Sequence, residues 1–303
     1  MGKTRRCKLG LPHFRSLTFA LMLLLTGASV QAASAIIPHG TLELVAENQW
    51  ITAGRTLNLG LHFQLEKGWH IYWVNPGDSG EPPRVKWHLP TGLTTGAMEW
   101  PAPRRLETSS IVDFGYEDAV TLIVPLHTAA NLTTQEPAQL AAEVSVLVCR
   151  ELCIPGKAQV SLTLPIKSQP AAPDGHAQDL FIVARKLLPR SVPKNWKFSV
   201  AVVNDSFVLT ANLGHQITQA TFFPLAESQL DNAAPQNFQP AAGGFRLTLL
   251  KSEQLRKPLA RLTGVLVLPA EQAYLIDVPL SKPTASKNVH SNFHATLFSK
   301  EEL

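Results

Sequence analysis

The fold is decided by residues 144–164, which read VSVLVCRELCIPGKAQVSLTL. Apolar runs of strand-like composition flank Cys149 and Cys153. In one straight strand these cysteines would lie about 13 Å apart, because a strand rises roughly 3.3 Å per residue. A disulfide needs Cα atoms within about 7 Å of each other. We therefore expect a hairpin that turns at residues 150–152 and places the cysteines opposite each other, about 4.5 to 5.5 Å apart.

Short apolar runs recur on both sides of this hairpin and predict a mainly β protein. Several alternate with polar residues, as Leu57, Leu59, Leu61 and Phe63 do on one face of a predicted strand. The 23 prolines and 18 glycines are spread between the runs, which is typical of many short strands. For residues 36–166 we predict a β-sandwich with strands at residues 41–47, 56–66, 69–74, 120–126, 140–148 and 157–164.

A polar linker rich in Pro and Ala, at residues 167–178, predicts a domain boundary. Asp174 is expected to cap one short helix that ends before Pro189, with Phe181 and Ala184 on its apolar face. We predict a second, smaller β domain at residues 179–281 and a flexible tail at residues 282–303. This half contains no cysteine and no acid/base cluster, so we expect a packing or partner-docking module. Its predicted strands are residues 196–203, 207–213, 217–223, 244–250, 262–268 and 273–280.

The first 35 residues have the three-part pattern of a secretory signal peptide. Five basic residues, the last of them Arg15, flank or precede an apolar stretch at residues 17–25, and small residues follow up to Ala35. Cleavage after Ala32 or Ala35 lowers the number of Lys and Arg from 27 to 22, against 23 Asp and Glu. The formal charge of +4 thus becomes about −1, and no basic patch for nucleic acid remains. We expect an exported chain without a membrane span, an uncleaved anchor being the alternative.

Two cysteines remain after cleavage, because Cys7 lies within the signal peptide. An oxidising compartment favours a disulfide between Cys149 and Cys153. Closing such a short loop stabilises a fold by only about 2 kcal/mol, whereas a hundred-residue loop gives nearly 5 kcal/mol. A purely structural role therefore gains little, and a redox-active pair is favoured. A structural bridge and a metal site are the two open alternatives.

Four separated motifs occur in an order that resembles a known family. They are GWHIYWVNPGDSGEPP at residues 68–83, WPAP at 100–103, FGY at 114–116 and VCRELCIP at 148–155. Together they resemble the N-terminal periplasmic domain of the thiol:disulfide interchange protein DsbD, and more closely its relative ScsB of the copper-sensitivity suppressor group. The resemblance is strong for residues 36–166 and weak for the second half.

This resemblance implies an immunoglobulin-like domain in the periplasm, where Cys149 and Cys153 pass two electrons by thiol-disulfide exchange. The electrons would come from a membrane-embedded donor and go to periplasmic thioredoxin-fold proteins. The family also has an aromatic cap over the redox pair, and Phe114 and Tyr116 occupy the corresponding stretch. Tyr72 and the turn residues Asn75 and Asp78 are candidates for framing the site, although an aromatic residue usually serves packing and the turn follows from composition alone.

Two departures from the family concern the partners. The membrane region and the C-terminal thioredoxin domain are absent from this sequence, so we expect the donor on a separate chain. Three residues separate the cysteines, as in the ScsB branch, whereas the loop in DsbD is longer.

Two further functional hypotheses remain beside a protein thiol-disulfide oxidoreductase. Two thiolates could bind Cu(I) and serve copper tolerance, but Met98 is the single methionine of the mature chain and the histidines show no ligand spacing. We therefore expect no metal site and no cofactor beyond the disulfide. The other hypothesis is a non-catalytic interaction module with a structural disulfide. Motifs of hydrolases and nucleotide-dependent enzymes are missing from the sequence.

Overall fold

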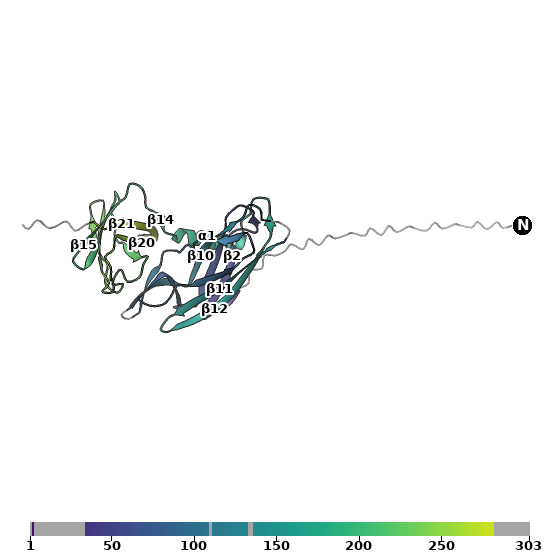
Figure 1. Cartoon of the computed structure of the whole chain (residues 1–303), viewed down its shortest axis with the longest axis horizontal. Helices are drawn as coiled ribbons and strands as arrows, with labels where there is room; N and C mark the ends of the chain where they lie inside the picture. Colours follow the sequence, from purple (N-terminus) through teal and green to yellow (C-terminus); the bar gives the residue numbers. More distant parts are fainter. Residues whose placement is uncertain (1, 3–33, 109–110, 133–135, 282–303) are drawn as a thin grey trace, which may run out of the picture.

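The structure of the chain is a computed structural model that describes residue 2 and residues 34–108, 111–132 and 136–281 (Figure 1). Two β domains follow each other along the chain, and helix α1 (Gly175–Leu187) lies where they meet (Figure 1). This agrees with the predicted mainly β fold with one short helix. Most of the predicted signal peptide and all of the predicted tail lie outside the described residues.

The first domain is a sandwich of two sheets. The first sheet has the order β1 (Ser34–Ile37), β2 (Gly40–Ala46), β4 (Leu57–Leu65), β10 (Ala119–Thr128) and β7 (Leu93–Thr95). The second has the order β12 (Cys153–Leu164), β11 (Ala138–Cys149), β5 (His70–Gly77), β9 (Ile111–Glu117) and β8 (Arg104–Thr108), and β6 (Arg84–His88) also pairs with β11.

Alternation along the strands builds the core between these sheets. On β4 the side chains of Leu57, Leu59, Leu61 and Phe63 are buried, as their period of two predicts. On β11 the same alternation buries Leu140 and its neighbours two residues apart. The two inner faces thus close a single apolar cluster, and the hairpin of β11 and β12 extends from it to Cys149 and Cys153 at its tip.

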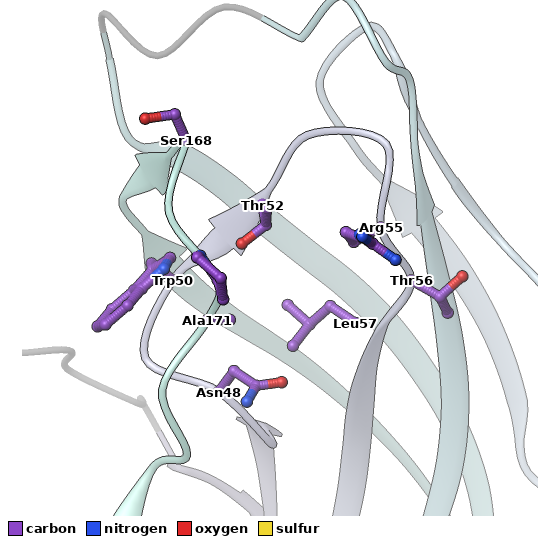
Figure 2. A pocket seen from close by; sticks show the side chains of 9 residues that line it. Asn48, Trp50, Thr52, Arg55, Thr56, Leu57, Ser168 and Ala171 are labelled. Atoms are coloured by element: carbon purple, nitrogen blue, oxygen red, sulfur yellow. The ribbon is translucent and has the colours of Figure 1, made fainter.

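The predicted linker is held against the first domain. A short parallel pair joins β3 (Ile51–Thr52) to β13 (Ile166–Lys167), and the carbonyl of Gln169 then accepts hydrogen bonds from Trp50 Nε1 at 3.3 Å and Thr52 Oγ1 at 2.9 Å. Figure 2 shows this segment beside the start of β4, where it borders a pocket of about 310 Å³. Leu57, which lines the pocket, begins β4. The cysteines lie toward the other end of this strand, because Cys149 pairs with His70, five residues after Leu65.

Helix α1 begins where the sequence predicts, since the side chain of Asp174 accepts hydrogen bonds from the backbone N–H groups of His176 and Ala177. Its apolar face packs on the first domain: Phe181 contacts the cluster formed by Val45 and Ile123. Arg185 Nη2 also donates to Oε2 of Glu47, the residue directly after β2, at 2.7 Å. The helix therefore packs on the first domain, and the predicted boundary at residue 178 falls within it.

The second domain packs two four-stranded sheets around its own apolar cluster, which includes Phe207, Leu209, Phe222 and Phe245. One sheet has the order β14 (Arg190–Ser191), β21 (Gln272–Pro279), β20 (Arg261–Leu268) and β17 (Thr221–Pro224). The other has the order β15 (Lys197–Val203), β16 (Ser206–Asn212), β19 (Gly244–Leu250) and β18 (Asn237–Ala241). The predicted smaller β domain is thus present.

Replacing Phe181 by alanine tests the placement of α1 on the first domain. The Phe181 side chain is 1% exposed, so Phe181→Ala is expected to lower the free energy of unfolding by about 3 kcal/mol, the usual cost of a cavity of this size. Val183→Ala is the matched control on the same helix, because Val183 is 56% exposed. Denaturant titration measures both, and an equal effect of the two substitutions would contradict the docking of this helix face.

Candidate redox site

Strands β11 and β12 form a long antiparallel hairpin that pairs Cys149 with Cys153 at its tip. A disulfide joins the two cysteines, and their Cα atoms are 4.1 Å apart. The N–H of Arg150 donates to the carbonyl of Leu152 at 3.2 Å and closes the turn. The hairpin predicted from the spacing is present, and its cysteines are slightly closer than expected.

The two cysteines of this disulfide differ in their exposure to solvent. Cys149 is 1% exposed and also pairs with His70 on β5, so it lies inside the sheet. Cys153 is exposed and follows Leu152, whose side chain is 60% exposed at the tip. A protein that approaches the tip therefore meets Cys153, while Cys149 stays behind it.

The side chain of Tyr72 contacts the sulfur of the exposed Cys153. Its hydroxyl oxygen lies 3.5 Å from Cys153 Sγ, and the hydroxyl donates because a disulfide sulfur carries no hydrogen. Burial raises the pKa of Tyr72 to about 12, and the nearby Asp113 carboxylate adds to this shift. Tyr72 therefore remains protonated and able to donate across the physiological range of pH.

A glycine lets the chain lie directly on the ring of Tyr72. At Gly80 the φ angle is +80°, and an added Cβ would lie 2.1 Å from Cζ of that ring. A side chain at this position would both strain the backbone and displace the ring. The segment that follows Asp78 thus covers the ring of Tyr72, whose hydroxyl contacts Cys153 Sγ.

The predicted framing residues Asn75 and Asp78 lie in the turn that leads to Gly80. The Asn75 side chain is 1% exposed and its Oδ1 accepts from the N–H of Gly77 at 3.1 Å. Asp78 Oδ2 accepts from the N–H of Val112 at 2.8 Å. Neither residue touches a sulfur in these contacts, so their connection to the disulfide passes through Gly80 and Tyr72.

Phe114 and Tyr116 lie on the other face of the sheet. In the register of β5 with β9, Tyr72 pairs with Gly115 and His70 with Glu117, so these residues share the face that carries Cys149. Phe114 and Tyr116 alternate with them and point into the sandwich core, where the Tyr116 hydroxyl donates to the Pro101 carbonyl at 2.7 Å. The structure therefore does not bring this predicted cap to the disulfide, because residues 114–116 form a strand and not a loop.

Trp69 supports the base of the hairpin tip. His39 stacks on its ring with centroids 3.6 Å apart, and the Arg150 guanidinium carbon lies 5.0 Å from the same ring centroid. The side chain of Glu66 in turn pairs with His39 Nδ1 at 2.8 Å. These contacts hold the side chain of Arg150, the residue after Cys149, against the ring of Trp69.

His70 is a site residue that the sequence analysis did not select. Its side chain is 5% exposed, its ring meets that of Tyr72 edge to face at 5.2 Å, and its Nε2 is buried without a hydrogen-bond partner. Burial lowers the pKa of His70, and this effect outweighs the carboxylates of Asp113 and Glu117, which raise it. The alternation His70-Tyr72 along one strand could have indicated that both share a face with the cysteines.

The described part of the chain contains no cluster of three or more His, Cys, Asp or Glu side chains suited to a metal ion. Within the same part, no helix has the length and apolar character needed to cross a bilayer.

Comparison with known proteins supports the resemblance found in the sequence. Residues 42–165 match the family described as the N-terminal region of the thiol:disulfide interchange protein DsbD. The crystal structure of the N-terminal periplasmic domain of ScsB from Proteus mirabilis aligns with a TM-score of 0.62 and 16% sequence identity, over 82% of this chain and 98% of that chain. This alignment shows a shared fold that includes most of both domains.

A second structure, the periplasmic chaperone SfaE, aligns with a TM-score of only 0.21 and 9% identity, over 78% of this chain and 98% of that chain. At this score the alignment supports no conclusion about the fold. No curated protein matches the sequence.

The burial of His70 predicts a pH dependence of stability. The unfolded chain binds a proton on His70 near pH 6.5 and the folded chain only at lower pH, so the free energy of unfolding falls as the pH drops below about 6.5. His70→Gln should flatten this dependence by at most about 1.4 kcal/mol per pH unit. Urea titrations between pH 7.5 and 5 measure it, with the exposed His127→Gln as the control. An unchanged slope in His70→Gln would contradict a neutral, buried His70.

Proposed function

Because residues 42–165 match the DsbD N-terminal family, we propose that this chain is a periplasmic carrier of two electrons. It would accept them from a membrane-embedded donor on another chain and pass them to thioredoxin-fold proteins. The observation that supports this most directly is the asymmetric disulfide, with Cys153 exposed and Cys149 buried four residues before it. A disulfide that served only stability would gain little from so short a loop.

The asymmetry assigns the two cysteines different steps. In the reduced protein the Cys153 thiolate attacks one sulfur of the partner's disulfide, and the partner's other sulfur leaves as a thiolate. Cys149 then loses its proton and attacks Cys153 Sγ, which forms the Cys149–Cys153 disulfide and releases the reduced partner. Two electrons pass to the partner, and the donor returns them by the same steps in reverse.

A groove along the hairpin, whose lining begins at Pro155 two residues after Cys153, offers room for a segment of the partner. It has a volume of about 840 Å³ and runs from Gly80 and Pro82 to Leu147 and Pro155 of the hairpin. Leu152 stands exposed at the tip of the same hairpin. We propose that the groove binds the extended chain around the partner's reactive cysteine, so that the attacked sulfur comes to Cys153.

Single cysteine variants test the assignment of the two steps. Cys149→Ser keeps the accessible Cys153 and lacks the residue that resolves the mixed disulfide, so it should accumulate covalent complexes with thioredoxin-fold proteins in periplasmic extract. Cys153→Ser keeps only the buried Cys149, so it should accumulate at least about tenfold fewer covalent complexes than Cys149→Ser. Non-reducing gels followed by mass spectrometry of the trapped proteins give the measurement.

The matched control is the double variant, which should form no complexes. Equal trapping by both single variants would contradict the assignment of Cys153 as the attacking residue. Absence of any thioredoxin-fold protein among the trapped partners would contradict the proposed carrier function itself.

A further inference from the structure

The second domain forms hydrogen bonds with the turn at residues 75–78, which leads to Gly80 and Tyr72. Asn75 Nδ2 donates to the carbonyl of Pro224 at 2.8 Å and lies 3.3 Å from the carbonyl of Ala226. Asn232 Nδ2 donates to Asp78 Oδ1 at 2.9 Å. The side chains of Asn75 and Asn232 are 1% and 8% exposed. These polar contacts across the domain boundary are buried or partly buried, and hydrogen bonds in such places are costly to leave unmade.

Apolar contacts surround the same turn. The ring of Phe223 meets that of Phe114 edge to face at 5.1 Å and that of Trp73 at 6.3 Å. Phe223 is 3% exposed and belongs to the apolar cluster of the first domain, although it comes from strand β17 of the second. The two domains are therefore joined by a shared core at this point, and the turn is held from both sides.

From this junction, contacts continue to the disulfide. Asp78 binds Asn232 with one carboxylate oxygen and the N–H of Val112 with the other. The next residue, Ser79, donates from its N–H and its hydroxyl to the buried Asp113 carboxylate, both at 2.9 Å. Gly80 then lies on the ring of Tyr72. The path ends at the Tyr72 hydroxyl, 3.5 Å from Cys153 Sγ.

We propose that the second domain positions the redox site, with Asn232 holding Asp78 so that Gly80 keeps the Tyr72 hydroxyl at Cys153 Sγ. Asn232 and Asp78 are positioning residues in this scheme, and Tyr72 is the group that touches the reacting atom. On reduction, the sulfur becomes a thiolate, which accepts a stronger hydrogen bond than a disulfide sulfur does. The Tyr72 hydroxyl then favours the reactive form of Cys153. This proposal rests on the proposed function of the cysteine pair.

A double-mutant cycle separates positioning from simple packing of the two domains. The readout is the rate of iodoacetamide alkylation of Cys153 in the reduced full chain from pH 5 to 10, with peptide masses that distinguish Cys153 from Cys149. Asn232→Ala should lower the rate at pH 7 about three- to tenfold and shift its pH midpoint upward, the effect of losing one hydrogen bond to the thiolate. Tyr72→Phe should do the same.

The decisive comparison is the double variant. If Asn232 acts through Tyr72, the substitution Asn232→Ala has no further effect in the Tyr72→Phe background. Additive effects in the double variant, or a wild-type profile in Asn232→Ala, would overturn the proposal. Glu271→Gln is the control, because it removes the exposed interdomain pair of Glu271 with Arg104, 3.7 Å apart, without touching the turn. It should keep the wild-type profile.

A second substitution guards against loss of folding. Asn232→Asp keeps the shape of the side chain and places a carboxylate against that of Asp78, so it should release the turn at neutral pH and give the same shift as Asn232→Ala. A wild-type profile in a folded Asn232→Asp protein would also overturn the proposal. Alkylation of Cys153 needs no partner protein. Failure to exchange with thioredoxin-fold proteins would therefore count against the proposed function only, and the alkylation rates would still test the positioning role of Asn232.

Discussion

The pairing of Cys149 with Cys153 across the β11–β12 hairpin is the constraint on which the site depends. Antiparallel pairing brings the two Cα atoms within 4.1 Å, so the bond closes without distortion of the surrounding strands' register. Because β11 lies inside its sheet and the tip projects beyond it, Cys149 is buried and Cys153 is exposed. The division of labour that we propose between an attacking and a resolving cysteine rests on this difference.

The rest of the molecule acts on this hairpin from two directions. Trp69 contacts Arg150 of the tip and also His39, which lies between β1 and β2 of the first sheet. The turn before Gly80 covers Tyr72 from the other side and is itself held by Asn232 of the second domain. In our proposal the second domain influences the environment of the cysteines through this contact. Packing of the two domains and positioning of Tyr72 would then depend on the same interaction.

Local pattern predicted the parts of the fold that depend on neighbours in sequence. The hairpin followed from the spacing of Cys149 and Cys153, and the strand at residues 244–250 from its alternation, because both are determined within about ten residues. The helix was predicted for the same reason, through Asp174 at its start. Its docking on the first domain was not, since burial of Phe181 against Ile123 depends on a contact between distant segments.

The site itself was predicted in part. The motif at residues 68–83 drew attention to Tyr72, but nothing in the sequence indicates that Gly80 covers its ring or that Asn232 reaches Asp78 from 154 residues away. Phe114 and Tyr116 were expected to form a cap, because the family that the sequence resembles has one at the corresponding stretch. In the structure Gly115 sits within β9 at a close approach to Ile71, where an added Cβ would lie 2.2 Å from the Ile71 carbonyl oxygen, and the alternation turns both aromatic rings into the core.

The reduction potential of the Cys149–Cys153 pair distinguishes a disulfide that exchanges electrons from one that only stabilises the fold. Purified protein would be equilibrated with thiol buffers of known potential, and the fraction of reduced cysteine measured by alkylation and mass spectrometry. A carrier that exchanges electrons with thioredoxin-fold proteins should give a value between about −280 and −120 mV, the range of known exchange proteins. A value below about −300 mV is typical of structural disulfides and would contradict the account.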